Sequence, residues 1–410
     1  MKIALLFPGQ GAQYAGMGYR LYQSEPIVRN VFEEISDACN VDLARLCFSG
    51  SKDELKKTEN AQLAIFTVSM ANYCYCIQYI ERPYILAGHS LGEISALTAS
   101  GALSLSDAAK VVYQRGLLMS KKTDFNNNRL GKMHAVIGLR THIVEEIINR
   151  IDHIAVQIAC YNTPNQTIVA GPQDVLELVD EEAKKFGAST VELQTAGPFH
   201  TSLMKDVGDA FSSVLQDLNI SMPKYDVVSS VDGNLYTETL SIKKNLNKQI
   251  SSPVYWKECM SQIIDRQPDF LIDMGPNKVM ESMTKWTGLK CYTVEENLNF
   301  IQNIKAEQII HTLKRCMGIA VCTPNKNWDT DAYYGGAIRP YKEIETMVSK
   351  LESNKEINGN EIVEALKLLH QIFCTKMVAE EEQKERFIQL RDETGYDQII
   401  NEFIEKNYRL

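Results

Sequence analysis

The fold is decided at residues 84–94, which read YILAGHSLGEI. Residues 84–87 are apolar and predict a short buried strand, and residues 94–100 predict a helix. Between them, GHSLG fits the pattern G-x-S-x-G, which requires this strand–turn–helix context. The two glycines let the backbone turn sharply, so that the Ser90 hydroxyl projects above the sheet. We therefore predict that Ser90 is a nucleophile; the alternative is a glycine-rich turn in which Ser90 only caps the helix.

The start of that helix supplies a second part of the same chemistry. Free N–H groups and the positive end of the helix dipole lie beside Ser90. The N–H of Leu91 is thus the natural first donor to the oxyanion that forms when the hydroxyl attacks a carbonyl carbon. The hydroxyl also needs a base at neutral pH, and the chain has seven histidines.

Among these histidines, His200 follows a predicted strand within the segment AGPFH, where turn residues could expose it at a sheet edge. An α/β-hydrolase would instead place its histidine after the acid and near the end of the chain. His311 and His370 would fill that position, but both lie on predicted helical faces. For His200 the alternative is a hydrogen-bonded structural histidine.

Outward from this motif, apolar strands alternate with helices. Residues 3–7 predict a buried strand that ends at Pro8-Gly9-Gln10-Gly11, and residues 62–79 predict a core helix. Such alternation is typical of a parallel sheet covered on both faces. Later strands of the same kind are predicted at 227–231, 270–273 and 291–294.

Residues 133–193 show a different order of predicted strands and helices. The polar segment 121–131, which contains Asn126-Asn127-Asn128, marks the boundary before them. The order strand, helix, strand, strand, helix, strand then follows, and it is the order of a ferredoxin-like unit. From residue 301 onward the pattern becomes helical, with apolar residues at helical spacing at Ile362, Leu366, Leu369 and Phe373.

Composition excludes several classes of protein. At 410 residues, the chain is too long for one ordinary domain and fits two or three. Apolar residues make up 44% and charged residues 23%, which is average for a globular protein. The formal charge is −9, from 43 basic and 52 acidic residues, and no window is strongly basic. This balance gives no support to a nucleic-acid partner.

The cysteines and the N-terminal residues indicate a reducing, cytoplasmic setting. Ten cysteines are spread along the chain, and the close pair Cys74 and Cys76 is a poor zinc signal. The first residues predict a strand and not a secretion signal, and no apolar run reaches 18 residues, so we expect no membrane span. We expect the cysteines to be mostly buried thiols.

Seven short motifs follow one another along the chain: FPGQG at 7–11, GHSLGE at 88–93, QRGLLM at 114–119, YNTP at 161–164, GPFH at 197–200, SPVYW at 252–256 and MGPNKV at 274–279. In this order they resemble the malonyl-CoA:acyl carrier protein transacylases, the acyltransferases of fatty-acid and polyketide synthesis. The resemblance implies an α/β-hydrolase-like large subdomain with a parallel sheet and an inserted ferredoxin-like small subdomain. We expect an acyltransferase domain at residues 1–300, its insert at about 131–195, and a mainly helical extension at 301–410.

The resemblance also implies a role for each matching residue. Ser90 would be the nucleophile and His200 the general base and acid. The main-chain N–H groups of Gln10 and Leu91 would hold the oxyanion. No acidic third residue matches, and the resemblance assigns the orienting of His200 to the main-chain carbonyl of Tyr255. A carbonyl oxygen can fix the imidazole tautomer without a carboxylate.

Arg115 matches the position that holds the free carboxylate of malonyl. A guanidinium offers a carboxylate two parallel N–H bonds, and an arginine in the apolar half of a helix is costly unless paired. The alternative is a side chain whose stem runs to the surface. Phe199 matches malonyl-selective members, since a bulky ring crowds an α-methyl branch, although Pro198 departs from the commoner small residue. Asn162 and His89 match positions near the active site.

The implied reaction is transfer of malonyl from malonyl-CoA, through a Ser90 ester, to the phosphopantetheine thiol of an acyl carrier protein. It requires no metal and no bound cofactor. The nearest alternative is an acyl hydrolase that clears stalled acyl groups from carrier proteins, but such homologues lack the arginine found at Arg115. A second alternative is a docking protein without activity, and the joint presence of Ser90, His200, Gln10 and Arg115 argues against it.

The extension is a segment that primary-metabolism transacylases do not have. Extended forms resemble discrete, trans-acting acyltransferases of polyketide or mixed peptide–polyketide assembly lines. Residues 301–410 are expected either to help dock a carrier protein or synthase module, or only to pack on the core. Because carrier proteins are acidic and this chain carries −9, a local basic patch is expected at the mouth of the cleft. We expect a monomer, with no nucleic acid or membrane as partner.

Overall fold

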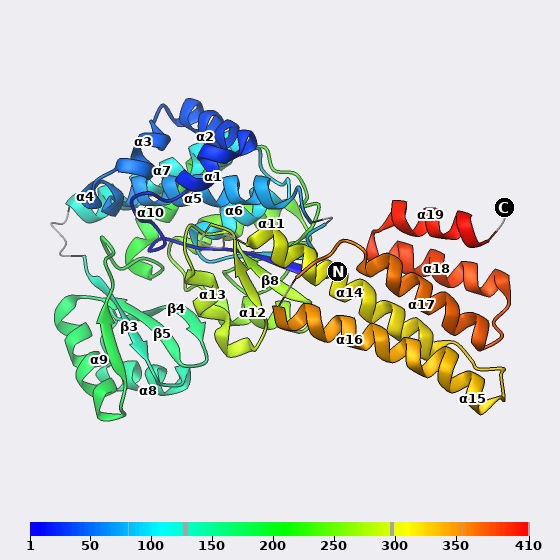
Figure 1. The fold of residues 1–410 in the computed structure, drawn as a ribbon. Helices are drawn as coiled ribbons and strands as arrows, with labels where there is room; N and C mark the ends of the chain where they lie inside the picture. The colour runs from blue at the N-terminus through cyan, green and yellow to red at the C-terminus, as the bar shows by residue number, and fades with distance from the viewer. Residues whose placement is uncertain (81, 126–129, 296–298, 355, 409–410) are drawn as a thin grey trace. The chain divides into compact units, whose positions relative to one another are not determined.

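The computed structural model describes residues 1–80, 82–125, 130–295, 299–354 and 356–408 (Figure 1). The asparagines at 126–128, which the sequence marks as a boundary, lie outside the described residues. The chain forms two compact units. The first comprises Lys2–Gln78 and Arg82–Leu298, and the second comprises Asn299–Leu410 with the short segment Tyr79–Glu81.

A five-stranded parallel sheet forms the centre of the first unit (Figure 1). Its strand order is β7-β2-β1-β8-β9, so the N-terminal strand lies in the middle. Every residue of β1 is buried, as expected for a parallel strand covered on both faces. The parallel sheet predicted from the sequence is therefore confirmed. The strands are β1 (Ile3–Phe7), β2 (Ile85–Gly88), β7 (Asp226–Val228), β8 (Phe270–Asp273) and β9 (Cys291–Thr293).

Helices connect these strands and cover the sheet. Helix α6 follows β2 directly, packs against β1 and β2, and is buried along its whole length. Helices α5 and α7 pack against each other, and α5 also contacts α6. The helices of this large subdomain are α1 (Tyr19–Ser24), α2 (Pro26–Cys39), α3 (Leu43–Ser49), α4 (Lys52–Lys56), α5 (Thr58–Cys76), α6 (Leu91–Ala99), α7 (Leu105–Phe125), α10 (Lys205–Gln216), α11 (Thr239–Gln249), α12 (Trp256–Ile264) and α13 (Val279–Thr284).

A four-stranded antiparallel sheet is inserted between α7 and α10. Its strand order, β4-β5-β3-β6, together with the chain order βαββαβ, is that of a ferredoxin-like unit, so this prediction is confirmed. Helices α8 and α9 lie on one face of the sheet (Figure 1) and share an apolar core with it, which includes Val136, Val144 and Val179. The elements are β3 (Lys132–Ile137), α8 (Thr141–Ile151), β4 (Gln157–Thr163), β5 (Gln166–Gly171), α9 (Gln173–Lys185) and β6 (Ser189–Glu192).

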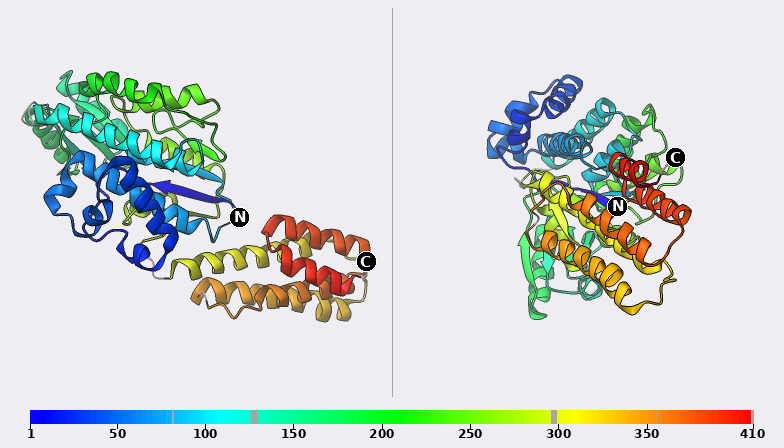
Figure 2. Two further views of the ribbon diagram at one scale, coloured as in Figure 1. Left: turned by 90° about the horizontal axis from the view of Figure 1, so that it is seen from above. Right: turned by 45° about the vertical axis from the view of Figure 1, so that its right-hand side comes forward.

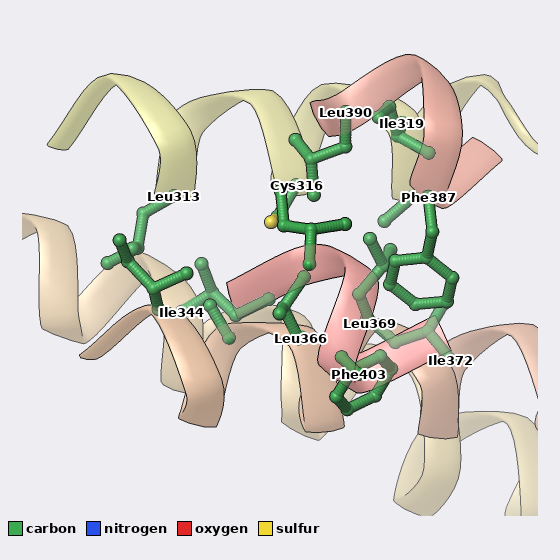
Figure 3. Packing of buried hydrophobic residues seen from close by; sticks show 14 of the residues in the cluster. Leu313, Cys316, Ile319, Ile344, Leu366, Leu369, Ile372, Phe387, Leu390 and Phe403 are labelled. Carbon is green, nitrogen blue, oxygen red and sulfur yellow. The ribbon is translucent and has the colours of Figure 1, made fainter. Parts of the chain in front are cut away.

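The second unit is a bundle of helices that run alongside one another (Figure 2). The predicted apolar stripe of Ile362, Leu366, Leu369 and Phe373 is buried in its core. Figure 3 shows Leu366 and Leu369 of this stripe among residues of the neighbouring helices, such as Leu313, Ile344 and Phe387. The helices are α14 (Phe300–Cys322), α15 (Thr330–Tyr333), a π-helical turn (Tyr334–Ile338), α16 (Arg339–Asn354), α17 (Glu361–Thr375), α18 (Glu380–Thr394) and α19 (Asp397–Asn407).

No helix in the described ranges has the length and apolar character that crossing a bilayer requires.

Candidate active site

Ser90 occupies a sharp turn between β2 and α6. Its backbone angles are φ 52° and ψ −113°, a conformation that residues with side chains rarely adopt. Only glycine fits at the positions two residues before and two residues after Ser90. A Cβ at Gly88 would lie 1.9 Å from the main-chain carbon of Gly92, and a Cβ at Gly92 would lie 2.0 Å from the carbonyl oxygen of Phe7. The two glycines of the motif thus allow the tight turn that presents the Ser90 hydroxyl at the end of a parallel strand.

His200 lies beside this hydroxyl. Its Nε2 is 2.7 Å from Ser90 Oγ, and both side chains are more than nine-tenths buried. The other ring nitrogen, Nδ1, lies 2.7 Å from the main-chain oxygen of Gln249 and must carry the proton of that hydrogen bond. Nε2 is therefore free to accept the proton of Ser90. The structure brings His200 to Ser90, whereas His311 and His370 belong to α14 and α17 of the second unit.

The carbonyl that orients His200 differs from the one expected, and the assignment to Tyr255 is wrong. Tyr255 caps the start of α12, and its carbonyl accepts the N–H of Cys259 at 3.0 Å. Gln249 is the last residue of α11, where carbonyl groups have no partner within the helix. This free carbonyl is the one that accepts from His200. The Tyr255 ring instead stacks on Tyr161, with ring centroids 5.0 Å apart.

Arg115 extends from α7 toward the same hydroxyl. It is 1% exposed, so its stem does not run to the surface. One terminal nitrogen donates to Gln62 Oε1 at 2.7 Å. The other donates to Gln249 Oε1 at 2.9 Å and to Ser90 Oγ at 3.1 Å. All three acceptors are uncharged, and among the described residues no ion pair joins Arg115 to a carboxylate. The guanidinium is thus positioned to bind an anion next to Ser90.

A cavity of about 240 Å³ opens over these groups. Its wall is largely apolar on the side of the small subdomain, with Met133 and Ile168 from the antiparallel sheet. The Nε2 atom of Gln10 is buried, with no hydrogen-bond partner in the described part of the chain, and remains available to a ligand. Of the residues predicted from the sequence, the cavity is lined by Gln10, His89, Ser90, Leu91, Arg115, Asn162, Phe199 and His200.

The comparisons with known proteins identify the family. The family model described as "Acyl transferase domain" matches residues 4–323. The chain belongs to this acyltransferase family. A malonyl CoA-acyl carrier protein transacylase of Bacillus subtilis is 30% identical over 408 residues, which cover 95% of this chain and 99% of that protein. Another transacylase of the same name, from Bacillus subtilis strain 168, is 35% identical over 296 residues, which cover 72% of this chain and 92% of the relative.

Among solved structures, a type II polyketide synthase acyl carrier protein in complex with its malonyl-transacylase has a TM-score of 0.71 and 30% identity, and the match covers 74% of this chain and 99% of that chain. The matches to the strain 168 relative and to this structure are about as long as the first unit. The match to the other Bacillus subtilis relative, over 408 residues, also includes the helical unit.

Burial controls the charges in the acyltransferase site. Burial, together with the nearby positive charge of Arg115, lowers the pKa of His200 to about 3. The imidazole is therefore neutral at physiological pH and able to accept a proton. Burial also lowers the pKa of Arg115 to about 10, which leaves the guanidinium charged. His89, whose Nε2 lies 2.9 Å from Asn162 Oδ1, has its pKa lowered by burial and is neutral as well.

Three residues of the acyltransferase site escaped the sequence analysis. Gln62 and Gln249 hold Arg115, and Gln249 also donates through Nε2 to the carbonyl of Ser90 at 3.0 Å. Glu93 accepts a hydrogen bond from the same Gln249 side chain. Glu93 stands within the GHSLGE motif, so its place in the sequence could have indicated a role in the site. Gln249 lies 159 residues from Ser90 on an ordinary helical segment, and nothing in the sequence there indicates such a role.

Proposed function

We propose that this acyltransferase transfers a malonyl group from malonyl-CoA to the phosphopantetheine thiol of an acyl carrier protein. The observation that carries the proposal is the buried guanidinium of Arg115, 3.1 Å from Ser90 Oγ and bonded only to neutral acceptors. Such a charge is costly unless an anion pairs with it. The distal carboxylate of malonyl supplies that anion and places the thioester carbonyl near the hydroxyl. The relatives named malonyl CoA-acyl carrier protein transacylase support the same donor and acceptor.

The first half-reaction loads Ser90. His200 Nε2 takes the hydroxyl proton while Oγ attacks the thioester carbon, and the N–H groups of Leu91 and Gln10 stabilise the oxyanion. Leu91 is the first residue of α6, where N–H groups have no partner within the helix. The bond from carbon to sulfur breaks, and His200 gives its proton to the departing sulfur, so that CoA leaves as a thiol and His200 is neutral again.

The second half-reaction reverses these steps with a different thiol. The phosphopantetheine thiol gives its proton to His200 and attacks the malonyl ester. The ester bond to Ser90 Oγ breaks, and the serine regains its proton from His200. Atoms and charges balance without an oxidant, a reductant or a further co-reactant, so the residues named are sufficient for this chemistry.

Phe199 supports selection of malonyl over branched acyl groups. Its ring is 4% exposed and lines the cavity. An α-methyl branch placed against it would meet a filled wall, and one methyl group in such a pocket is worth about 1–3 kcal/mol. We therefore propose a finite preference for malonyl over methylmalonyl. His89 and Asn162, bonded to each other, would hold part of the cavity wall in place.

A groove beside the cavity supports a carrier protein as partner. It has a volume of about 640 Å³ and shares Gln10, Leu193 and Thr195 with the cavity. Lys52 and Lys56 of α4 line it; both are exposed, and neither forms an ion pair with any described residue. They are candidates for the local basic patch expected at the mouth, where an acidic carrier protein or a phosphate would bind.

The helical unit carries a separate proposal about the partner. We propose that the enzyme acts in trans on carrier domains of a polyketide or mixed synthase and that residues 301–410 help to dock them, although packing alone would also account for an extension. Removal of residues 301–410 tests this. Slower transfer to a cognate carrier with unchanged loading from malonyl-CoA is expected, and unchanged transfer would contradict docking.

We further propose that the enzyme works as a monomer in the cytoplasm. All ten cysteines lie in the described part of the chain and are free thiols, as in a reducing compartment.

The function is tested by incubating the protein with malonyl-CoA, with and without a holo carrier protein. We expect malonyl to move to the carrier thiol and little malonate to be released in its absence. A Ser90→Ala variant serves as the control for non-enzymatic transfer. Rapid release of malonate without a carrier would instead identify an acyl hydrolase.

A further inference from the structure

One buried carboxyl group near Ser90 takes no part in the steps above. Glu93 lies in the first turn of α6, and its exposed fraction is 0%. Its Oε2 accepts hydrogen bonds from Ser230 Oγ, at 2.6 Å, and from Gln249 Nε2. Its Oε1 accepts one from the Tyr236 hydroxyl. Burial raises the pKa of Glu93, and the three donors oppose that shift. An acid fully removed from water and held by three donors is expensive to maintain, which calls for a function.

Gln249 connects this acid to the reacting groups. Its side-chain nitrogen donates to Glu93 and to the main-chain oxygen of Ser90, the latter at 3.0 Å. Its side-chain oxygen accepts from Arg115 at 2.9 Å. Its main-chain oxygen accepts from His200 at 2.7 Å. One residue therefore holds the backbone of the nucleophile, the base and the guanidinium at once.

The partners on either side fix which way the Gln249 amide points. The Glu93 oxygen accepts a hydrogen bond from the NH2 group. Arg115 has only donors and therefore bonds the amide oxygen. A flipped amide would place its oxygen against the carboxylate and its NH2 group against the guanidinium, so that both contacts would be repulsive. The field of Glu93 also raises the pKa of Arg115, against the lowering by burial. In the order Glu93, Gln249, Arg115, each donor therefore faces an acceptor.

We propose that Glu93 is a positioning residue that acts through Gln249. By fixing the Gln249 amide at both ends, it holds the carbonyl that orients His200 and the guanidinium beside Ser90. In a Ser-His-Asp triad the acid contacts the histidine directly. Here the acid lies one residue further away and orients both the base and Arg115. The inference rests on the proposed function, because it assumes that Ser90 and His200 perform the chemistry.

The test is Glu93→Gln in the full chain, which keeps the shape of the side chain but replaces one acceptor oxygen with an NH2 group. The new side chain can accept from or donate to the Gln249 amide, so the two orientations of that amide become similar in energy, and His200 and Arg115 lose their fixed positions. Loading of Ser90 should slow roughly 10- to 100-fold, the range found when the groups that orient a metal-bound histidine are removed. Both malonyl-CoA and acetyl-CoA should be affected, since the base is shared, and the KM for malonyl-CoA should also rise.

Tyr236→Phe is the matched control. It removes a hydrogen bond from the carboxylate oxygen that does not face Gln249. It should lower the thermal midpoint to a similar extent while loading rates stay near those of the wild type. If both variants lose stability and loading in the same proportion, Glu93 is only structural and the proposal is wrong.

A double-mutant cycle tests whether Glu93 acts through Gln249. Gln249→Leu removes the side-chain bonds and keeps the main-chain carbonyl. If the effect of Glu93 passes through this side chain, adding Glu93→Gln to Gln249→Leu should slow loading no further. Losses that multiply would overturn the proposal. A wild-type protein that fails to form a malonyl adduct would instead contradict the proposed function, so the two failures are distinguishable.

Discussion

The two units of the chain bury polar side chains for different purposes. In the helical unit, the Lys376 ammonium donates to the main-chain oxygens of Ala320 and Thr323 at the end of α14, each at 2.7 Å. The carboxylate of Glu361 accepts two main-chain N–H bonds just before α17. Lys376 satisfies carbonyl groups at the end of α14, and Glu361 fixes the turn that leads into α17, so both support local structure.

In the acyltransferase unit, one group of buried polar side chains contacts chiefly its own members and the cavity. Ser90, His200, Arg115 and Gln249 form this connected set, and its guanidinium has only neutral acceptors. Burying such a set costs free energy, and only the bond from His200 to the last carbonyl of α11 also satisfies a helix end. The comparison shows that buried polar groups indicate a functional site when they bond to one another and line a cavity.

The largest expected effect is on the stability of the helical unit, with no change in catalysis. Leu369 is fully buried in the helical core, and Leu369→Ala should lower the free energy of unfolding of that unit by about 2–5 kcal/mol. Malonyl loading per folded molecule should not change, because the second unit contributes no residue to the cavity. Denaturant titration and single-turnover loading measure the two effects. Lys367→Ala, exposed on the same helix, is the control, and a parallel loss of loading would contradict the separation.

Arg115→Ala should remove the site for the malonyl carboxylate. Charge-assisted hydrogen bonds are worth about 1.5–3 kcal/mol, so loading from malonyl-CoA should fall roughly 10- to 160-fold relative to loading from acetyl-CoA. Competition between the two donors measures this ratio directly. Lys110→Ala, exposed on the same helix, should leave the ratio unchanged. An equal loss for both donors would remove Arg115 as the carboxylate anchor.

Lowering the pH should reduce stability before it affects activity. Because the pKa of His200 is depressed to about 3, the folded protein binds fewer protons than the unfolded chain below the ordinary histidine pKa of about 6.5. Stability should fall as the pH drops from 6.5 toward 3, by at most about 1.4 kcal/mol per pH unit for this group. The loading rate should stay constant from pH 7.5 to about 5.5, since the base remains unprotonated.

Denaturation curves of the wild type and of His200→Gln, each measured across this pH range, isolate the contribution of His200 to stability. A loading rate that halves near pH 6.5 would show that the base has an ordinary pKa and would contradict the electrostatic account of the site.

The smallest expected effect concerns the mouth of the groove. Lys52→Glu with Lys56→Glu should raise the KM for a holo carrier protein by a few fold, since exposed charge pairs contribute about 0.2–1 kcal/mol each. The effect should shrink at high salt. Lys57→Glu, which is exposed next to α4 but does not line the groove, is the matched control. Equal changes for all three lysines would reflect net charge alone.

The sequence was sufficient for those parts of the molecule that depend on local patterns. Apolar strands and the strand–turn–helix at Ser90 predicted the parallel sheet, and the βαββαβ order predicted the insert. His200 and Arg115 stand in short recognisable motifs, and the structure brings both to Ser90.

The supporting residues could not be predicted, because packing alone brings them together. Gln249 has a site role only because α11 ends where its carbonyl and side chain meet three other elements. The wrong choice of Tyr255 has the same origin. Which carbonyl is free depends on where α11 ends and α12 begins, and boundaries of helices are the least certain part of a sequence-based prediction.

The central claim is that this buried set of side chains forms a covalent malonyl ester on Ser90. Intact-protein mass spectrometry after brief exposure to malonyl-CoA tests it directly. The wild type should gain the mass of one malonyl group, and Ser90→Ala should gain none while binding malonyl-CoA non-covalently. A covalent malonyl adduct that persists in Ser90→Ala would contradict the assignment of the nucleophile and the account built on it.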